Sequence, residues 1–304
     1  MEQHSVSIIM SIYNENEEEL KKSIFSILNQ SYKNIDLIIV NDNPKSQINR
    51  SLLASLNDSR VKIINNSDNL GIVGSLNKAL EKCRGSFVAR MDADDISHLN
   101  RINIQLNYLK NNNLDLVGSW IELIDNKDVI FDKMVFPVSS KFINASMKYG
   151  GCVPHPTWLA KKEVFKNLKG YRTIPNCEDY DFLLRALKNG FKIGNVPLYL
   201  LKYRVRPNGI SSKNKIQQIV LRRFLSKNFN NISDLSEQQV AEYMKTNEYN
   251  DCISDLSIYE NIKQLYKNKH SLRSLARIMT NKEFYRYITE KGIVKTILKI
   301  DNAC

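Results

Sequence analysis

Long apolar runs are missing from this sequence. No stretch of about 18 consecutive apolar residues occurs, so we expect no helix that spans a membrane. The first five residues include an acid and run directly into a strand-like segment, and we do not expect them to act as a signal peptide. Both observations favour a protein that works in the cytoplasm.

Cysteine is also sparse. The chain has five cysteines, an odd number, and none of them forms a Cys-x-x-Cys pair. This usage argues against a disulfide framework and against a zinc site, and it fits a reducing compartment.

Charge of one sign is in excess. The 304 residues carry a formal net charge of +12, with 42% hydrophobic and 25% charged residues. The length suffices for one large core and a helical appendix. The positive balance indicates an anionic partner: nucleic acid, an anionic membrane surface or a phosphorylated substrate. Composition alone does not choose among them.

Short apolar runs alternate with helical patterns over the first hundred residues. We expect strands at 6–10, 35–40, 61–64 and 87–91, and helices near 20–28, 52–56 and 69–82. Asn14 is the expected N-cap of the first helix. This alternation predicts βαβ units and a mostly parallel sheet, with ligands bound beyond the carboxyl ends of its strands. Polar clusters around Tyr13, Asp42 and Asp92 follow three of these strands, so one crevice is expected to hold all three.

Two acidic clusters stand out. Asp92, Asp94 and Asp95 follow a buried strand, and carboxylates this close together resist burial unless a cation compensates them. Oxygen ligands suit Mg²⁺ or Mn²⁺, although a solvated acidic turn is the alternative. The second cluster, 178–181, opens a periodic helix from 182 onward. Acids at a helix start are common because they complement the helix dipole, so this cluster alone is ambiguous.

The chain changes character after Lys213, where helical periodicity continues without clear strands. The segment 263–299 holds ten Lys or Arg against two acids, with aromatic residues interleaved. Such a segment fits contact with an anionic membrane surface. A solvated helix face explains it equally well.

Several motifs occur together in a fixed order, at 7–14, 38–43, 69–77, 90–95, 155–157, 178–181 and 203–204. In this order they resemble the inverting nucleotide-sugar glycosyltransferase family 2, which has the GT-A fold and includes bacterial O-antigen and capsule enzymes. The resemblance covers about 5–212. We therefore expect a GT-A, Rossmann-like α/β domain at 1–212, with a mostly parallel sheet flanked by helices, and a basic helical extension at 213–304.

The resemblance implies roles on the donor side. Asp42 would bond the uracil, and backbone near Ile12 and Tyr13 would line the base. Asp94 would be the metal ligand, with Asp92 as a second ligand nearer the ribose. Asn77 and Arg90 would complete the nucleotide-sugar site, and the metal, Mn²⁺ or Mg²⁺, would stabilise the leaving diphosphate.

On the acceptor side, the resemblance implies that Asp179 is the catalytic base. Glu178 and Asp181 would position the acceptor or the base, and His155 would lie near the acceptor, although a plain loop residue is equally consistent. Two departures matter. Asn41 replaces a family acid beside Asp42, and Arg206 stands near a position where relatives carry histidine; arginine cannot ligate a metal but can bind diphosphate.

The resulting hypothesis is transfer of a hexose, with galactose the best guess, from a UDP-sugar to a lipid-diphosphate-linked saccharide. The enzyme would lie on the inner, anionic face of the plasma membrane; the sequence does not indicate its oligomeric state. A nucleotidyltransferase is the enzymatic alternative, but 11–16 lacks the glycine-rich loop it would need. A nucleic-acid-binding module is the second alternative. It would need basic residues around the aromatics of the sheet, and they concentrate in the tail instead, so we expect no nucleic-acid partner.

Overall fold

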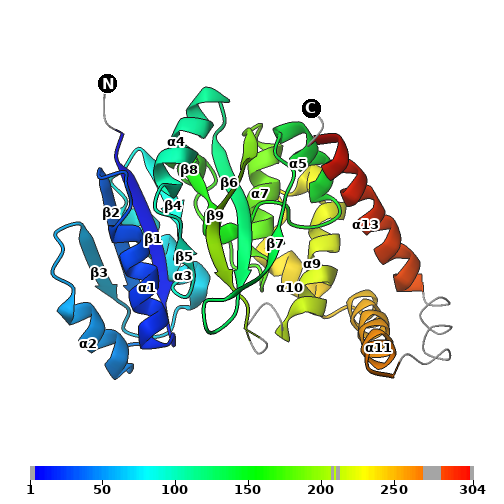
Figure 1. Cartoon of the computed structure of the whole chain (residues 1–304). Coiled ribbons are helices and arrows are strands. Elements are labelled where there is room, and N and C mark those ends of the chain that lie inside the picture. The colour runs from blue at the N-terminus through cyan, green and yellow to red at the C-terminus, as the bar shows by residue number, and fades with distance from the viewer. Residues whose placement is uncertain (1–3, 207–208, 210–212, 270–281, 302–304) are drawn as a thin grey trace.

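The structure, a computed structural model, describes residues 4–206, 209, 213–269 and 282–301 (Figure 1). Its strands are β1 (Val6–Ile12), β2 (Ile35–Asn41), β3 (Val61–Asn65), β4 (Phe87–Arg90), β5 (Ile96–Ser97), β6 (Leu116–Ile124), β7 (Ile130–Met134), β8 (Leu159–Lys161) and β9 (Ile193–Arg204). They form a nine-stranded sheet in the order β3-β2-β1-β4-β8-β6-β9-β5, and β7 pairs with β6 outside this path.

Helices surround this sheet. The first part of the chain contributes α1 (Glu17–Leu28), α2 (Gln47–Ser55), α3 (Gly71–Lys82), α4 (Arg101–Asn111), α5 (Ser140–Met147), the short 3₁₀ helix η1 (His155–Thr157), α6 (Lys162–Asn167) and α7 (Glu178–Lys188). The last part contributes α9 (Lys215–Lys227), η2 (Phe229–Asn231), α10 (Glu237–Tyr243), α11 (Asn247–Lys269) and α13 (Lys282–Asp301).

The amino-terminal half of the sheet is parallel, as predicted. β1 pairs in parallel with β2 and with β4, and β2 pairs in parallel with β3. β8 then runs antiparallel to both β4 and β6, so the whole sheet is mixed. Parallel neighbours end at the same edge, and Ile12 at the end of β1 lies opposite Asn41 at the end of β2. The expected gathering of strand ends is confirmed.

Two hydrophobic cores cover the two faces of the sheet. Alternate residues of β1 point to opposite faces: Ile9 packs in the core that contains Leu76 of α3, and Ile8 packs in the core that contains Ile24 of α1. All four side chains are fully buried. Burying one such side chain stabilises the fold by about 1.5–3 kcal/mol. This alternation therefore fixes the register of β1, and with it the position of the carboxyl end of β1 at the edge of the sheet.

The carboxyl-terminal helices extend the first of these cores. Leu221 and Leu225 of α9 are buried in the same cluster as Leu183 of α7, and the helices coloured yellow to red in Figure 1 lie at the side of the molecule away from β3 and α2. The expected change to helices after 213 is confirmed in the described residues. The core itself continues across that boundary. None of the described helices is both long and apolar enough to cross a membrane.

Two local expectations differ from the structure. The N-cap of α1 is Asn16, whose side chain accepts a hydrogen bond of 2.9 Å from the amide of Glu18, so the assignment to Asn14 was wrong. Glu15 consequently lies before the helix. The segment 131–147, which the sequence left unassigned, forms most of the exposed strand β7 and the helix α5.

Candidate active site

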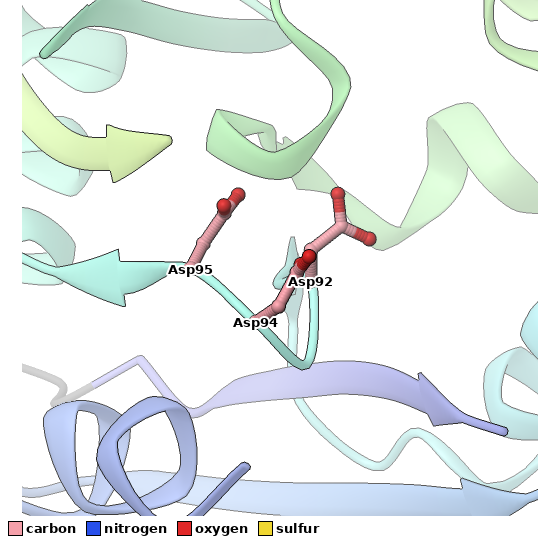
Figure 2. A group of neighbouring side chains, drawn as sticks. All are labelled: Asp92, Asp94 and Asp95. Atoms are coloured by element: carbon pink, nitrogen blue, oxygen red, sulfur yellow. The ribbon is translucent and has the colours of Figure 1, made fainter. Parts of the chain in front are cut away.

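Three carboxylates converge on the turn between β4 and β5. Asp92, Asp94 and Asp95 each offer an oxygen, and these oxygens all lie within 4.8 Å of one another (Figure 2). Burial, together with the charge of Asp92, raises the pKa of Asp94 to about 6. Burial and both neighbouring acids raise the pKa of Asp95 well above its usual value. One oxygen of Asp95, Oδ2, is buried without a hydrogen-bond partner.

This donor set fits a divalent cation. It consists only of oxygens, and mutual repulsion in a buried site is relieved when a positive ion binds between the carboxylates. Asp92 and Asp94 are partly exposed, which leaves the site open to water and to a ligand. Mg²⁺ and Mn²⁺ prefer such hard ligands and keep part of their coordination for water or phosphate.

Two arginines pair with the cluster. The guanidinium of Arg90 forms an ion pair with Asp92, and the Nε of Arg206 lies 3.2 Å from a carboxylate oxygen of Asp94. Arg90 is buried, and its Nε and Nη1 have no hydrogen-bond partner. Arg206 also pairs with Glu19 at 2.6 Å and keeps a third of its side chain exposed. Both arginines therefore place positive charge where a diphosphate would approach the carboxylates.

Arg204 holds the carboxylate turn in place from β9. Its backbone amide donates to Asp95 Oδ1 at 2.8 Å, and its Nε donates to the carbonyl oxygen of Asp94 at 2.8 Å. Its Nη1 donates to the carbonyl oxygen of Asp125 at 2.7 Å. The Tyr-Arg pair at 203–204 carries this clamp, a role that sequence reasoning did not assign.

Asp42 lies at the end of β2 and is 2% exposed. Its Oδ1 accepts hydrogen bonds from Asn66 Nδ2 at 2.7 Å and from the amide of Leu70 at 2.8 Å. These bonds fix the carboxylate in one orientation. Its other oxygen, Oδ2, takes no part in these two bonds.

Asn41 has a structural role that the family's acid could not take over unchanged. Its Oδ1 accepts from Asn49 Nδ2 at 3.0 Å, and its Nδ2 donates to Asn65 Oδ1 at 3.0 Å. Only an amide both accepts and donates in this way, whereas a carboxylate only accepts. The departure from the family pattern is matched by these two partners.

The end of β1 offers one accessible side chain. Ile12 is fully buried, and its carbonyl oxygen accepts from the amide of Asp42 at 2.8 Å. The carbonyl oxygen of Tyr13 accepts from Asn49 Nδ2 at 3.1 Å, while the Tyr13 side chain is exposed at 47%. Of the two, Tyr13 is the residue that a ligand can reach.

Asn77 pairs with the backbone of Tyr171. Its Nδ2 donates to the carbonyl oxygen of Tyr171 at 2.9 Å, and its Oδ1 accepts from the Tyr171 amide at 2.9 Å. Both polar ends of the side chain therefore tie α3 to the turn at Gly170 and Tyr171. This pairing gives Asn77 a structural role, and its contact with a nucleotide sugar stays a prediction.

Glu178 and Asp179 form a second acidic pair in the first turn of α7. Burial first and the charge of Asp179 second raise the pKa of Glu178 to about 7. Burial also raises the pKa of Asp179, against the lowering effect of the Tyr180 amide, which donates to Asp179 Oδ1 at 2.7 Å. The charge of Arg90 lowers the pKa of both acids as well as that of Asp94, so Arg90 lies near both carboxylate clusters.

Asp181 does not belong to this open pair. It is fully buried, and its carboxylate forms ion pairs with Arg172 and with Arg185, the latter at 2.8 Å. The guanidinium of Arg185 also donates to the carbonyl oxygens of Leu168 and Gly170. Direct contact of Asp181 with an acceptor does not fit this burial, whereas the other role expected for it, positioning the base, does. The residue secures the start of α7, on which Asp179 stands.

His155 lies in an aromatic cluster. Its Nε2 is 2.8 Å from the hydroxyl of Tyr171, and its ring centroid is 4.5 Å from that of Trp158. Burial, with the nearby charge of Arg90, lowers the pKa of His155 well below its usual value, so the ring is neutral. It is a buried residue in η1 rather than an exposed loop residue, and its expected place near the acceptor stays a prediction.

Comparison with known proteins identifies the chain. Residues 7–185 match the model of the family described as glycosyl transferase family 2. The chain belongs to glycosyl transferase family 2. An uncharacterized glycosyltransferase of Methanocaldococcus jannaschii is 37% identical over 68% of this chain and 73% of its own length. An O-antigen biosynthesis glycosyltransferase of Escherichia coli is 35% identical over 66% of this chain and 79% of its own length. These matches set aside the nucleotidyltransferase and nucleic-acid-binding alternatives.

A third relative has a more specific name. An Escherichia coli UDP-Glc:alpha-D-GlcNAc-diphosphoundecaprenol beta-1,3-glucosyltransferase is 30% identical over 72% of this chain and 84% of its own length. Among solved structures, the fold is similar to a Pyrobaculum calidifontis mannosyltransferase in complex with GDP-Man and Mn²⁺ (TM-score 0.58, 15% identity, 99% of this chain and 86% of that one). This likeness supports the GT-A fold.

Sequence reasoning missed two further residues of this glycosyltransferase site. Burial raises the pKa of Glu15 to about 6. The charge of Asp94 also raises this pKa, and the charge of Arg206 lowers it. Burial raises the pKa of Tyr171, and the charges of Arg90 and of both acidic clusters also act on it. Glu15 follows directly on the motif at 7–14 and could have been found by extending that motif. Tyr171 lies in a segment without a motif.

Proposed function

We propose that this glycosyltransferase is metal-dependent and inverting, and that it transfers a hexose from a UDP-sugar to a lipid-diphosphate-linked saccharide in the synthesis of a surface polysaccharide. Galactose is the donor sugar that we propose. The observation that carries the proposal is the pairing of two separate acidic groups, 92–95 and 178–179, around Arg90. One group suits the leaving diphosphate and the other suits the attacking hydroxyl.

Asp94, with Asp92 as second ligand, would hold Mn²⁺ or Mg²⁺. A bound ion supplies Lewis-acid stabilisation of the negative charge that develops on the departing nucleoside diphosphate. Arg206, beside Asp94 at 3.2 Å, adds a direct bond donor to the same phosphates. Asp42 through Oδ2 and the exposed ring of Tyr13 provide the contacts for the uracil.

Asp179 takes the proton of the acceptor hydroxyl in this proposal. A single displacement with inversion needs a base on the side of the sugar opposite the leaving group, and Asp179 comes from a different segment than the metal-binding carboxylates. Its raised pKa makes its carboxylate a stronger base than an exposed aspartate. Glu178, with a pKa of about 7, would position the acceptor or the base.

His155 supports this side of the site from behind. Its neutral ring accepts or donates to Tyr171 rather than to a ligand, and Tyr171 in turn is close to Arg90 and Asp179. The acceptor is proposed to be lipid-linked because a relative is named for a diphosphoundecaprenol acceptor. The basic segment 263–299 would then hold the enzyme on the inner, anionic face of the plasma membrane; 270–281 of it lies outside the described residues.

A screen of UDP-sugars tests the proposal. UDP release is measured with Mn²⁺, with Mg²⁺ and with EDTA, in the presence and absence of GlcNAc- or GalNAc-diphosphate-lipid. We expect release that needs the metal, is greatest with one hexose donor, and rises when the acceptor is present. A GDP-sugar that supports faster transfer than any UDP-sugar would overturn the donor assignment.

A further inference from the structure

A small cavity of about 70 Å³ lies beside Asp179, and three parts of the chain form its wall. Asp179 and Tyr180 come from the start of α7, and Gly151 comes from the segment after α5. Gln218 and Arg222 come from α9. Since the family match ends at residue 185, α9 supplies a wall of the acidic site from outside the shared part of the family.

Arg222 differs from the arginine next to it in the partners it has. Its Nε donates to the carbonyl oxygen of Gln218 one turn earlier, at 3.1 Å. Among the described residues, no carboxylate lies within the 4.0 Å ion-pair distance of Arg222. Arg223, by contrast, pairs with Glu283 at 2.7 Å and with Glu290 at 3.4 Å. Arg222 thus lines the cavity without an acid paired to it among the described residues.

The charge of Arg222 reaches the groups around the cavity. It lowers the pKa of Asp179 and that of Tyr180, in both cases against the raising effect of burial. It also lowers the pKa of Cys177, which lines the same cavity. A guanidinium at this position offers several donors in a planar fork, the geometry that matches a phosphate.

Gly151 leaves the opposite wall open. A Cβ added to Gly151 would meet only the Nη1 of Arg222, at 3.9 Å, with no other atom within 4 Å. A side chain at this position would therefore begin in van der Waals contact with the guanidinium. The absence of one keeps the approach to Arg222 free.

We propose that Arg222 and this cavity form a subsite for an anionic group of the acceptor, a phosphate attached to the sugar whose hydroxyl attacks. The proposal rests on the proposed function, because it takes Asp179 as the base. A hydroxyl within hydrogen-bond reach of Asp179 places the other substituents of the same sugar within a few ångströms, where Arg222 stands. The phosphates of the donor are held elsewhere, at Asp94 and Arg206.

The subsite is tested with three acceptors that carry the same sugar: a GlcNAc-diphosphate-alkyl, a neutral alkyl glycoside with the same chain, and a neutral methyl glycoside. We expect wild-type protein to prefer the diphosphate acceptor over the neutral alkyl glycoside. Arg222→Gln should raise KM for the diphosphate acceptor by about 10- to 100-fold, as expected for one lost charge-assisted contact, and leave KM for the donor and for the neutral acceptors unchanged. Lys227→Gln, on the same helix but exposed, is the charge-matched control.

A second pair of variants separates charge from size. Gly151→Asp places a carboxylate near Arg222 and should weaken binding of the diphosphate acceptor as Arg222→Gln does. Gly151→Asn introduces a side chain of the same size without the charge and should weaken this binding much less. Binding of the diphosphate acceptor by calorimetry, with UDP and Mn²⁺ present, gives a readout that does not depend on turnover. Equal binding by wild type and Arg222→Gln overturns the subsite.

Two further outcomes are distinguishable. In the first, Arg222→Gln lowers kcat with all three acceptors and shifts the acid limb of the pH–rate profile to higher pH, while the acceptor KM stays the same. Arg222 then acts only on the pKa of Asp179, and the subsite is overturned. If no UDP-sugar supports transfer although the binding difference is present, the proposed function fails and the anion subsite stands. A preference of wild type for the neutral alkyl chain over the diphosphate assigns recognition to the lipid and overturns the subsite.

Discussion

Arg204 Nε donates a 2.8 Å hydrogen bond to the carbonyl oxygen of Asp94, and the two residues are 110 positions apart in the chain. Through this bond and the bond from the Arg204 amide to Asp95, the last strand of the sheet fixes the orientation of the carboxylate turn. Partners that orient metal ligands typically matter for affinity nearly as much as the ligands themselves.

Arg204→Lys should weaken Mn²⁺ binding about 10- to 100-fold, because lysine keeps the charge but cannot make the bonds to Asp94 and Asp125 together. Titration calorimetry with Mn²⁺ and UDP measures the effect. Arg60→Lys alters an ion pair with Asp58 remote from the turn and serves as the control. Unchanged Mn²⁺ affinity in Arg204→Lys would show that the turn holds its shape without the clamp.

Asp94→Ala should abolish transfer and metal-dependent UDP binding and leave the fold intact, since Asp94 is partly exposed and its loss relieves repulsion with Asp92. Circular dichroism and UDP binding with and without Mn²⁺ are the measurements. Asp132→Ala, on the exposed strand β7, controls for loss of one negative charge. Near-normal turnover of Asp94→Ala with Mn²⁺ would contradict the metal assignment.

Asp179→Asn should lower kcat by about 10²–10⁴, the usual loss when a general base is removed, and leave the affinities for UDP-sugar and Mn²⁺ nearly unchanged. The amide keeps the shape of the side chain but cannot take the proton. Initial rates beside titration calorimetry provide the test. If Asp179→Asn keeps its rate and Glu178→Gln loses it, Glu178 is the base.

Glu178 should make the protein less stable as pH rises. Its pKa in the folded state is about 7, above the value of 4.5 for a free side chain, so the folded state binds more protons between these values and the free energy of unfolding falls with pH. Glu178→Gln removes that loss. It should match wild type near pH 4.5 and exceed it above pH 7, by an amount on the order of 1 kcal/mol.

Urea denaturation at pH 4.5, 6 and 8 in EDTA measures this difference. Glu163→Gln, an exposed glutamate in the first turn of α6, is the control and should change stability equally at each pH. A parallel offset between Glu178→Gln and wild type at all three values would contradict the shifted titration.

The basic segment should bind anionic membranes in a salt-dependent manner. Each basic residue near such a surface contributes about 1 kcal/mol, and salt screens it. Lys295→Glu with Lys299→Glu, both exposed on α13, should reduce cosedimentation with phosphatidylglycerol vesicles several-fold in low salt. Lys62→Glu with Lys110→Glu, two exposed residues outside the basic segment, reverses the same amount of charge and is the control. Equal losses in the two pairs would show a non-specific charge effect.

The fold could be predicted where local pattern and tertiary position agree. Strands β1 to β4 were expected within two residues of their observed ends because they are short, mainly apolar runs bounded by polar residues. β8, three residues long and antiparallel between β4 and β6, was read only as part of a longer segment. A strand of three residues is too short to show a periodic pattern. It forms because its backbone pairs with β4 on one side and with β6 on the other.

The site could be predicted where its residues are neighbours in sequence. The carboxylates of 92–95 form one turn, so their convergence follows from the chain itself. The ion pair of Asp181 was missed although Arg185 lies four residues later, an i,i+4 spacing that indicates an ion pair on one helix face. The bond of Asn77 to Tyr171 was not foreseen because the two residues are 94 positions apart, and no local signal indicates such a bond.

Helix α9 presents two sets of positions that differ in what they tolerate. Val220, Leu221 and Leu225 are buried in the main core, whereas Gln218 and Arg222, one turn apart, face the cavity beside Asp179. A library for directed evolution of new acceptor preferences can therefore randomise positions 218 and 222 while it keeps 220, 221 and 225 fixed. Four positions of separation put both randomised side chains on one wall of the cavity, so their effects should be selected as pairs rather than singly.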